Sequence, residues 1–180
     1  MNEQRFNNRI GFHARTIEEL NLGISTPLVD LVELKPDHLK KRSGFELYTF
    51  DGRKFSINHV SARQMQTLLE SKGIEAQIHV PYEESHNPEV ETGLCHADRS
   101  HHDMLLSRID MLGELYERYK IGTVLTMHPP AFRLNWKTSE GKRKLEWTEE
   151  EAMKAGIEFY EKVDELIRKK GYGFKIGIEN

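Results

Sequence analysis

The residues Gly73-Ile-Glu-Ala-Gln-Ile-His79-Val-Pro-Tyr82 show the pattern from which the fold is predicted. A glycine just after a lysine marks the end of a helix, a mainly apolar run follows as a strand, and a histidine stands where the strand ends. A strand of this kind followed by a helical pattern recurs along the whole chain. The sequence therefore predicts an α/β fold of alternating strands and helices in a single domain, residues 1–180.

Five segments have the composition of strands that are buried on both faces, as parallel strands are. They alternate with segments in which apolar residues recur every three or four positions, which is typical of helices that pack on a sheet. The predicted strands are Arg9–His13, Leu28–Leu34, Glu75–Val80, Thr123–Met127 and Phe174–Ile178.

The predicted helices carry recognisable start and stop signals. Threonine followed three residues later by glutamate is a capping box, serine also caps helices, and glycine after a lysine-bearing turn ends them. The start signals are Thr16 with Glu19, Ser61, and Thr148 with Glu151, and the stop signals are Gly73 and Gly171.

Three connections are long. In residues 43–58, apolar alternation around Asp51-Gly52 predicts an inserted β-hairpin. Tyr82–Arg99 and Pro129–Trp147 are predicted to be loops, and both follow the carboxyl end of a strand. In parallel α/β folds ligands bind at that edge of the sheet, so these loops are where functional residues are expected.

Composition excludes several classes of protein. The chain has 180 residues, 37% of them hydrophobic, with 26 Lys and Arg against 29 Asp and Glu and a net charge of −3. This is too apolar for a disordered protein, and the charge is wrong for a polybasic partner of nucleic acid. One cysteine, Cys95, excludes an intrachain disulfide, and we expect a cytoplasmic protein without a membrane span.

Three predicted strands end in groups that could bind a metal. These are His79, His128 and Glu179, which lie about fifty residues apart in the sequence. Because parallel strands end at one edge of a sheet, two imidazoles and one carboxylate would meet there. A catalytic Zn²⁺ or Mn²⁺ site uses such a set and leaves one position open. The alternative is that each histidine only forms hydrogen bonds with a neighbouring loop.

The motifs His79-Val-Pro-Tyr82, Met127-His-Pro-Pro130 and Gly177-Ile-Glu-Asn180, each after a hydrophobic strand, resemble those of the xylose-isomerase-like TIM-barrel superfamily. That group includes sugar and sugar-phosphate isomerases and epimerases, and the endonuclease IV type of nuclease. The resemblance covers nearly the whole chain and is strongest in residues 75–180. It implies an incomplete (β/α) TIM barrel with about five of its eight parallel β/α units, the amino-terminal portion of a barrel.

The resemblance also implies roles for individual residues. His79 and His128 match the histidines that end the third and fourth strands, and Glu179 matches the fifth-strand carboxylate, a metal ligand and catalytic residue. Further ligands and the catalytic base would follow Asn180. We expect the chain to be a piece of a longer protein, and the alternative is an open sheet that completes itself by association as a homo-oligomer.

Several other residues are candidates for binding a substrate. Glu33 resembles the second-strand acid of the superfamily, although a structural ion pair with Lys35 or another neighbour explains it equally well. His13 ends the first strand on the same edge, where a hydrogen-bonded structural role is its alternative. The loop residues Arg133 and Trp136 suit a lid over a sugar, a nucleic-acid contact or an ordinary solvated loop. Tyr82 completes the set of candidate substrate-binding residues.

The first hypothesis is a divalent-metal-dependent isomerase or epimerase of a small sugar or sugar phosphate. The alternative is an endonuclease IV-like zinc phosphodiesterase acting on abasic DNA. The net charge of −3 and the segment Gly11-Phe-His13-Ala-Arg15, which stands where that branch has His-Val-Ser, disfavour it. A second alternative is a binding module without catalytic activity.

Overall fold

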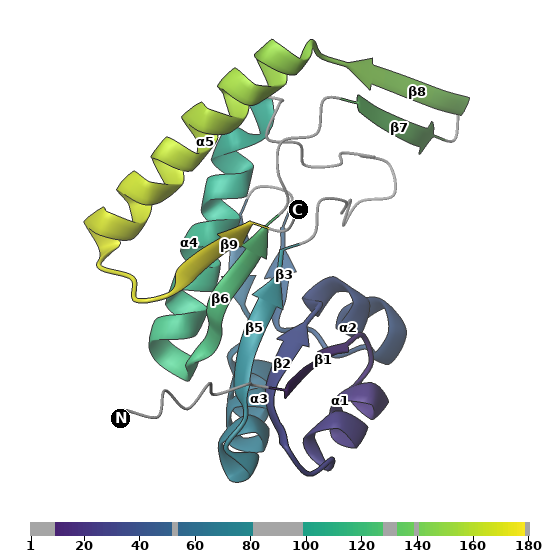
Figure 1. Cartoon of the computed structure of the whole chain (residues 1–180), viewed down its shortest axis with the longest axis vertical. Helices are drawn as coiled ribbons and strands as arrows, with labels where there is room; N and C mark the ends of the chain where they lie inside the picture. The colour runs from purple at the N-terminus through teal and green to yellow at the C-terminus, as the bar shows by residue number, and fades with distance from the viewer. Residues whose placement is uncertain (1–9, 52–53, 81–98, 128–132, 139–140, 179–180) are drawn as a thin grey trace, which may run out of the picture.

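A parallel sheet forms the centre of the computed structural model, which describes residues 10–51, 54–80, 99–127, 133–138 and 141–178 (Figure 1). Its strand order is β1-β2-β5-β6-β9, so each strand pairs with the one that precedes it in the chain among these five. All five predicted strands are present, and each begins and ends within two residues of its prediction. They are β1 Ile10–Ala14, β2 Val29–Leu34, β5 Glu75–His79, β6 Ile121–Met127 and β9 Lys175–Ile178.

Helices connect these strands. In Figure 1, α3 and α4 lie behind the sheet and α5 runs along α4, with which it is in contact. When successive strands are parallel neighbours and each connection is a right-handed crossover, the connecting helices lie on one side of the sheet, as in a barrel. The helices are α1 Ile17–Ile24, α2 Pro36–Ser43, α3 His59–Lys72, α4 His102–Tyr119 and α5 Glu149–Lys170, with a short 3₁₀ turn η1 at Arg99–His101.

The predicted helix ends are largely confirmed. Thr148 and Glu151 form the complete capping box of α5. At α1, Thr16 caps the amide of Glu19, but the Glu19 carboxylate accepts from Arg15 rather than from Thr16. The prediction that Ser61 caps α3 is wrong, because Asn58 does so.

The Asn58 side chain accepts a hydrogen bond from the Ser61 amide and starts α3 three residues earlier than predicted. Gly73 and Gly171 end α3 and α5 with positive φ angles of 65° and 71°. Helix α2 was not predicted, and its signals are Pro36 at its start and Gly44 in the left-handed conformation at its end.

Two antiparallel hairpins interrupt the alternation. The predicted insertion contains β3 Tyr48–Phe50 paired with β4 Phe55–Ile57. The second hairpin pairs β7 Arg133–Thr138 with β8 Gly141–Glu146, so the prediction of a loop over Pro129–Trp147 is wrong for these residues. The alternation of polar and apolar residues from Arg133 to Thr138 is the signal that indicates a strand there.

The sheet is buried more completely on one face than on the other. Val32 and Leu34 are fully buried and Ala76 and Ile78 are 1% exposed, whereas the intervening residues of β2 are half-buried. The expectation of burial on both faces is therefore met on one face only. The physical reason is that the sheet stays open within the described part of the chain, so the second face packs against fewer groups.

An apolar surface accompanies β9 at one edge of the sheet. Met153 and Ile157 of α5 are 48% and 55% exposed, and Ile178 of β9 is 47% exposed. Ile157 recurs with Tyr160 and Val163 at the spacing of three that predicts a packed helix face, yet it lies at the surface. No strand among the described residues pairs with β9 on its outer side, which explains this exposure.

A buried ion pair joins the first hairpin and α2 to α4. Arg108 of α4 and Asp37 of α2 are 1% and 5% exposed, and their Nη2 and Oδ2 atoms lie 2.5 Å apart. The hydroxyl of Tyr48 in β3 donates to Asp37 over 2.8 Å and also contacts Arg108. The guanidinium lies 5.3 Å from the ring centres of both Tyr48 and Phe55. These contacts hold the insertion against the body of the protein.

Within the described residues, the helices include none with the length and hydropathy needed to cross a lipid bilayer.

The structure predicts that Arg108→Met strongly destabilises the fold. The substitution keeps much of the side-chain volume but leaves Asp37 as a buried carboxylate without its cation, which costs about 3–5 kcal/mol. Urea unfolding followed by circular dichroism measures this loss. The control is Arg118→Met on the same helix, where an exposed pair with Glu114 at 3.9 Å contributes little. Equal stability of the two variants would contradict a central role for the buried pair.

Candidate functional site

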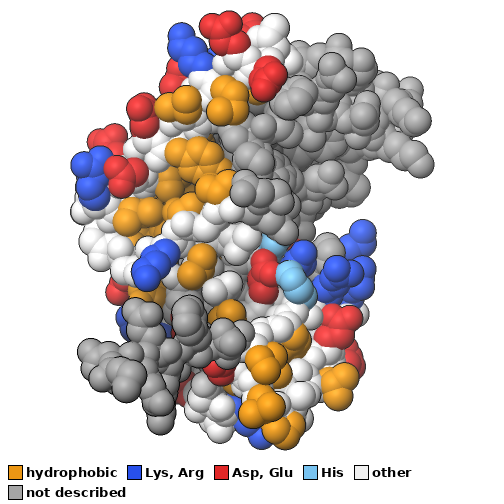
Figure 2. Space-filling view, viewed as in Figure 1, with side chains coloured by type: hydrophobic (Ala, Val, Ile, Leu, Met, Phe, Trp, Pro, Cys, Tyr) orange, Lys and Arg blue, Asp and Glu red, His pale blue; other side chains and the backbone are white. Residues whose placement is uncertain are grey.

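Polar side chains from three neighbouring strands meet at the carboxyl edge of the sheet. His13 lies near the end of β1, Glu33 near the end of β2, and His79 is the last residue of β5. Figure 2 shows histidine side chains beside acidic and basic side chains at this surface. The prediction that His13 and His79 reach the same edge is therefore realised in the structure.

Strand register explains why these three side chains meet. His13 pairs with Glu33 across β1 and β2, and Glu33 pairs with Gln77 across β2 and β5. His79 lies two residues beyond Gln77, and residues two apart on a strand point to the same face. All three side chains therefore project from one face, the less buried one.

Glu33 binds both histidines with its two carboxylate oxygens. Its Oε1 atom lies 2.7 Å from Nδ1 of His79, and its Oε2 atom lies 2.7 Å from Nδ1 of His13. The three side chains differ in exposure: His79 is 8% exposed, Glu33 17% and His13 55%. The cluster thus extends from a buried imidazole through a carboxylate to an imidazole at the surface.

The charge of Glu33 follows from its surroundings. Burial by itself would raise the pKa of this carboxyl. The hydrogen bond from His79 and the electrostatic interactions with His13, His79 and Lys35 oppose this effect and lower its pKa below the usual value. Glu33 is therefore ionised at neutral pH. The charge of Lys35 contributes to lowering this pKa. The predicted ion pair with Lys35 therefore describes only part of the surroundings of Glu33.

Other predicted site residues lie outside the described part of the chain. These are Tyr82, His128 and Glu179. Strand β6, which precedes His128, is described up to Met127, and β9, which precedes Glu179, is described up to Ile178. Met127 and Ile178 pair with each other across these two strands. Arg133 and Trp136 lie on β7, where they pair with Glu146 and Arg143, and the structure describes their backbone alone.

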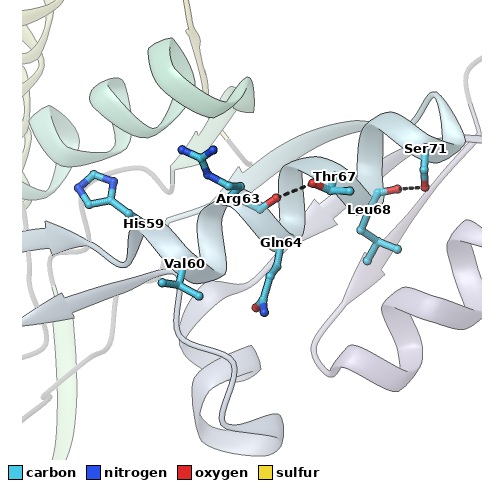
Figure 3. Close-up of a pocket in the computed structure, with 7 residues that line it drawn as sticks. All are labelled: His59, Val60, Arg63, Gln64, Thr67, Leu68 and Ser71. Carbon is cyan, nitrogen blue, oxygen red and sulfur yellow. Dashed lines mark hydrogen bonds between the residues drawn. The ribbon is translucent and has the colours of Figure 1, made fainter.

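A groove among the described residues lies elsewhere. It measures about 740 Å³ and runs along one face of α3, from His59 to Ser71 (Figure 3). Val60, which lines it, is 70% exposed. All the lining residues belong to this one helix, and none stands at the end of a strand of the central sheet. The groove therefore brings no groups from different elements together for chemistry, unlike the cluster around Glu33.

The cluster alone is not a complete metal site. Within the described residues, no group of three or more His, Cys, Asp or Glu side chains is arranged to hold a metal ion. The contact between Glu33 and His79 does fit a known element of such sites, in which a carboxylate binds one ring nitrogen of a metal-ligating histidine. His79 therefore has the surroundings of a ligand, and the other predicted ligands lie outside the described residues.

Comparison with solved structures supports the architecture. A crystal structure of a D-tagatose 3-epimerase-like protein superposes with a TM-score of 0.58 at 14% sequence identity. The chain has an incomplete TIM-barrel fold. The alignment covers 96% of this chain and 52% of that protein, so the chain spans about half of its length. No family model matches the sequence, and no curated protein matches it.

The lowered pKa of Glu33 predicts how Glu33→Gln affects stability. A carboxyl whose pKa is lower in the folded state stabilises that state above its unfolded pKa, about 4.3. This contribution disappears as the pH falls through the folded pKa. We expect the wild type to be the more stable protein near neutral pH, with the difference shrinking below about pH 4.5.

Urea unfolding of the metal-free proteins in a chelator, from about pH 3 to about pH 7, measures this difference. The control is Glu114→Gln, since Glu114 is an exposed residue 3.9 Å from Arg118. A stabilising contribution of Glu33 that grows as the pH falls would contradict the assignment.

Proposed function

We propose that this chain carries part of a divalent-metal-dependent isomerase or epimerase that acts on a small sugar or sugar phosphate. The observation that carries the proposal is the set of His13, Glu33 and His79 on the carboxyl edge of a parallel sheet. Active sites of TIM barrels lie at this edge, where residues from several strand ends meet.

Two further observations support the choice of reaction. The fold is shared with a protein described as D-tagatose 3-epimerase-like. The sequence motifs around His79, His128 and Glu179 resemble those of sugar isomerases and epimerases. The net charge of −3 favours a small substrate over the phosphate backbone of nucleic acid.

The proposed roles follow from chemistry and exposure. His79, His128 and Glu179 would hold Zn²⁺ or Mn²⁺, whose donors in proteins are imidazole and carboxylate. Bound there, the cation would supply a Lewis acid that polarises the carbonyl of a sugar. The Glu33 carboxylate holds the buried His79 ring in one orientation. Glu179 would be the carboxylate nearest the reaction.

Residues at this edge and in the segments that follow it are proposed to bind the substrate. The His13 ring is fixed by Glu33 and is 55% exposed, so it can form a hydrogen bond with a sugar hydroxyl at the surface. Tyr82, Arg133 and Trp136 are proposed to contact the substrate from the segments that follow β5 and β6. Arginine would suit the phosphate of a sugar phosphate.

Metal analysis of the purified protein by mass spectrometry tests the proposed ligands. We expect stoichiometric Zn or Mn in the wild type and its loss in His79→Ala and His128→Ala, because each removes one ligand. His59→Ala is the matched control, since His59 binds Tyr119 on the outer helices and should not affect metal content. A metal-free wild type, or retention of metal by His79→Ala, would contradict the proposed site.

Exchange of a carbon-bound proton with solvent tests the reaction without knowledge of the substrate. Ketoses and ketose phosphates are incubated in D₂O with the metal-loaded full-length protein that contains this chain and the proposed catalytic base, and deuterium next to the carbonyl is followed by NMR. We expect incorporation by the wild type and a loss of about 100-fold or more in His79→Ala. Absence of exchange together with cleavage of abasic DNA, and two or three metal ions per chain, would favour the nuclease alternative instead.

A further inference from the structure

The Glu33 carboxylate contacts the Nδ1 atom of each of two histidines. Glu33 contacts Nδ1 of His79 through Oε1 and Nδ1 of His13 through Oε2, each at 2.7 Å. We propose that Glu33 is a positioning residue that holds both rings in the tautomer protonated at Nδ1. Both Nε2 atoms then carry the lone pair. The assignment of the tautomers stands on this geometry, and only the identity of what Nε2 binds rests on the proposed function.

The tautomers follow from the hydrogen-bonding capacity of a carboxylate. An ionised carboxylate accepts hydrogen bonds and cannot donate one. A glutamate carboxyl is ionised at neutral pH, because its ordinary pKa is about 4.3. Each Nδ1 atom must therefore supply the proton of its contact. In a neutral imidazole the second nitrogen is then an acceptor, and this nitrogen is Nε2 in both rings.

Exposure separates the roles of the two rings. His79 is 8% exposed, so its Nε2 atom suits a ligand position within the protein. His13 is 55% exposed, so its Nε2 atom suits acceptance of a hydrogen bond from a substrate hydroxyl at the mouth of the site. A single acidic residue thereby prepares both the proposed metal-binding group and the proposed substrate-binding group.

Replacing Glu33 by glutamine makes the proposal testable. The glutamine amide has one oxygen that accepts and one nitrogen that donates, so it can satisfy only one ring protonated at Nδ1. The second ring can pair with the amide NH₂ only by accepting at Nδ1, which moves its own proton to Nε2. Glu33→Gln should therefore convert one of the two rings to the other tautomer and leave its partner unchanged.

Two-bond proton–nitrogen correlation spectra of uniformly ¹⁵N-labelled protein read the tautomer of each histidine directly. The chain contains 9 histidines, and His13→Ala and His79→Ala assign the two signals of interest. The spectra are recorded in a chelator at a pH where the rings are neutral. Glu46→Gln is the matched control, because Glu46 is a partly exposed carboxylate paired with Lys40 away from the cluster.

We expect both rings protonated at Nδ1 in the wild type and in Glu46→Gln, and one ring protonated at Nε2 in Glu33→Gln. Zinc affinity measured by competition with a chromophoric chelator should fall about 10- to 100-fold in Glu33→Gln, as for other carboxylates behind metal ligands. A wild-type ring protonated at Nε2, or unchanged tautomers in Glu33→Gln, would overturn the proposal. If the tautomers are as expected but the protein binds no metal, the role of Glu33 is upheld and the proposed function is rejected.

Discussion

The parallel direction of the five strands is the constraint on which the site depends. Because each pair of neighbouring strands is parallel, every strand of the sheet ends at the same edge. Residues from β1, β2 and β5 that are far apart in the sequence thus come within hydrogen-bonding distance. A change of strand order would separate His13 from His79 and leave Glu33 without one of its partners.

Holding this edge in place requires the layer behind it. The polypeptide between Glu33 and His79 contains α2, an inserted hairpin and α3. The buried contact of Arg108 with Asp37 and Tyr48 joins α2 and the hairpin to α4. Burying charge is expensive unless it is paired, so separating α2 from α4 would leave a buried charge without its partner. The fold therefore fixes the segments on both sides of the cluster.

Much of the fold could be predicted from the sequence because burial and capping leave local signals. Apolar runs predicted all five strands of the central sheet. The spacing of Thr148 and Glu151 predicted the start of α5, where these residues form a capping box. Competition between neighbouring signals was harder to resolve, since Asn58 rather than Ser61 caps α3. The edge position of Glu33 was predictable from its strand. Its bonds to two histidines were not, because pairing across strands depends on register.

The two edges of the open sheet have different relations to the site. β9 is separated from the Glu33 cluster by β6 and β5, so a segment that pairs with β9 can vary without touching the described histidines. β1 is the opposite edge and carries His13, whose ring is half-exposed. Any strand that joins β1 would run beside this residue. A strand added beside β9 would thus leave the Glu33 cluster unchanged. A strand added beside β1 would instead shape the entrance through which a molecule reaches the cluster.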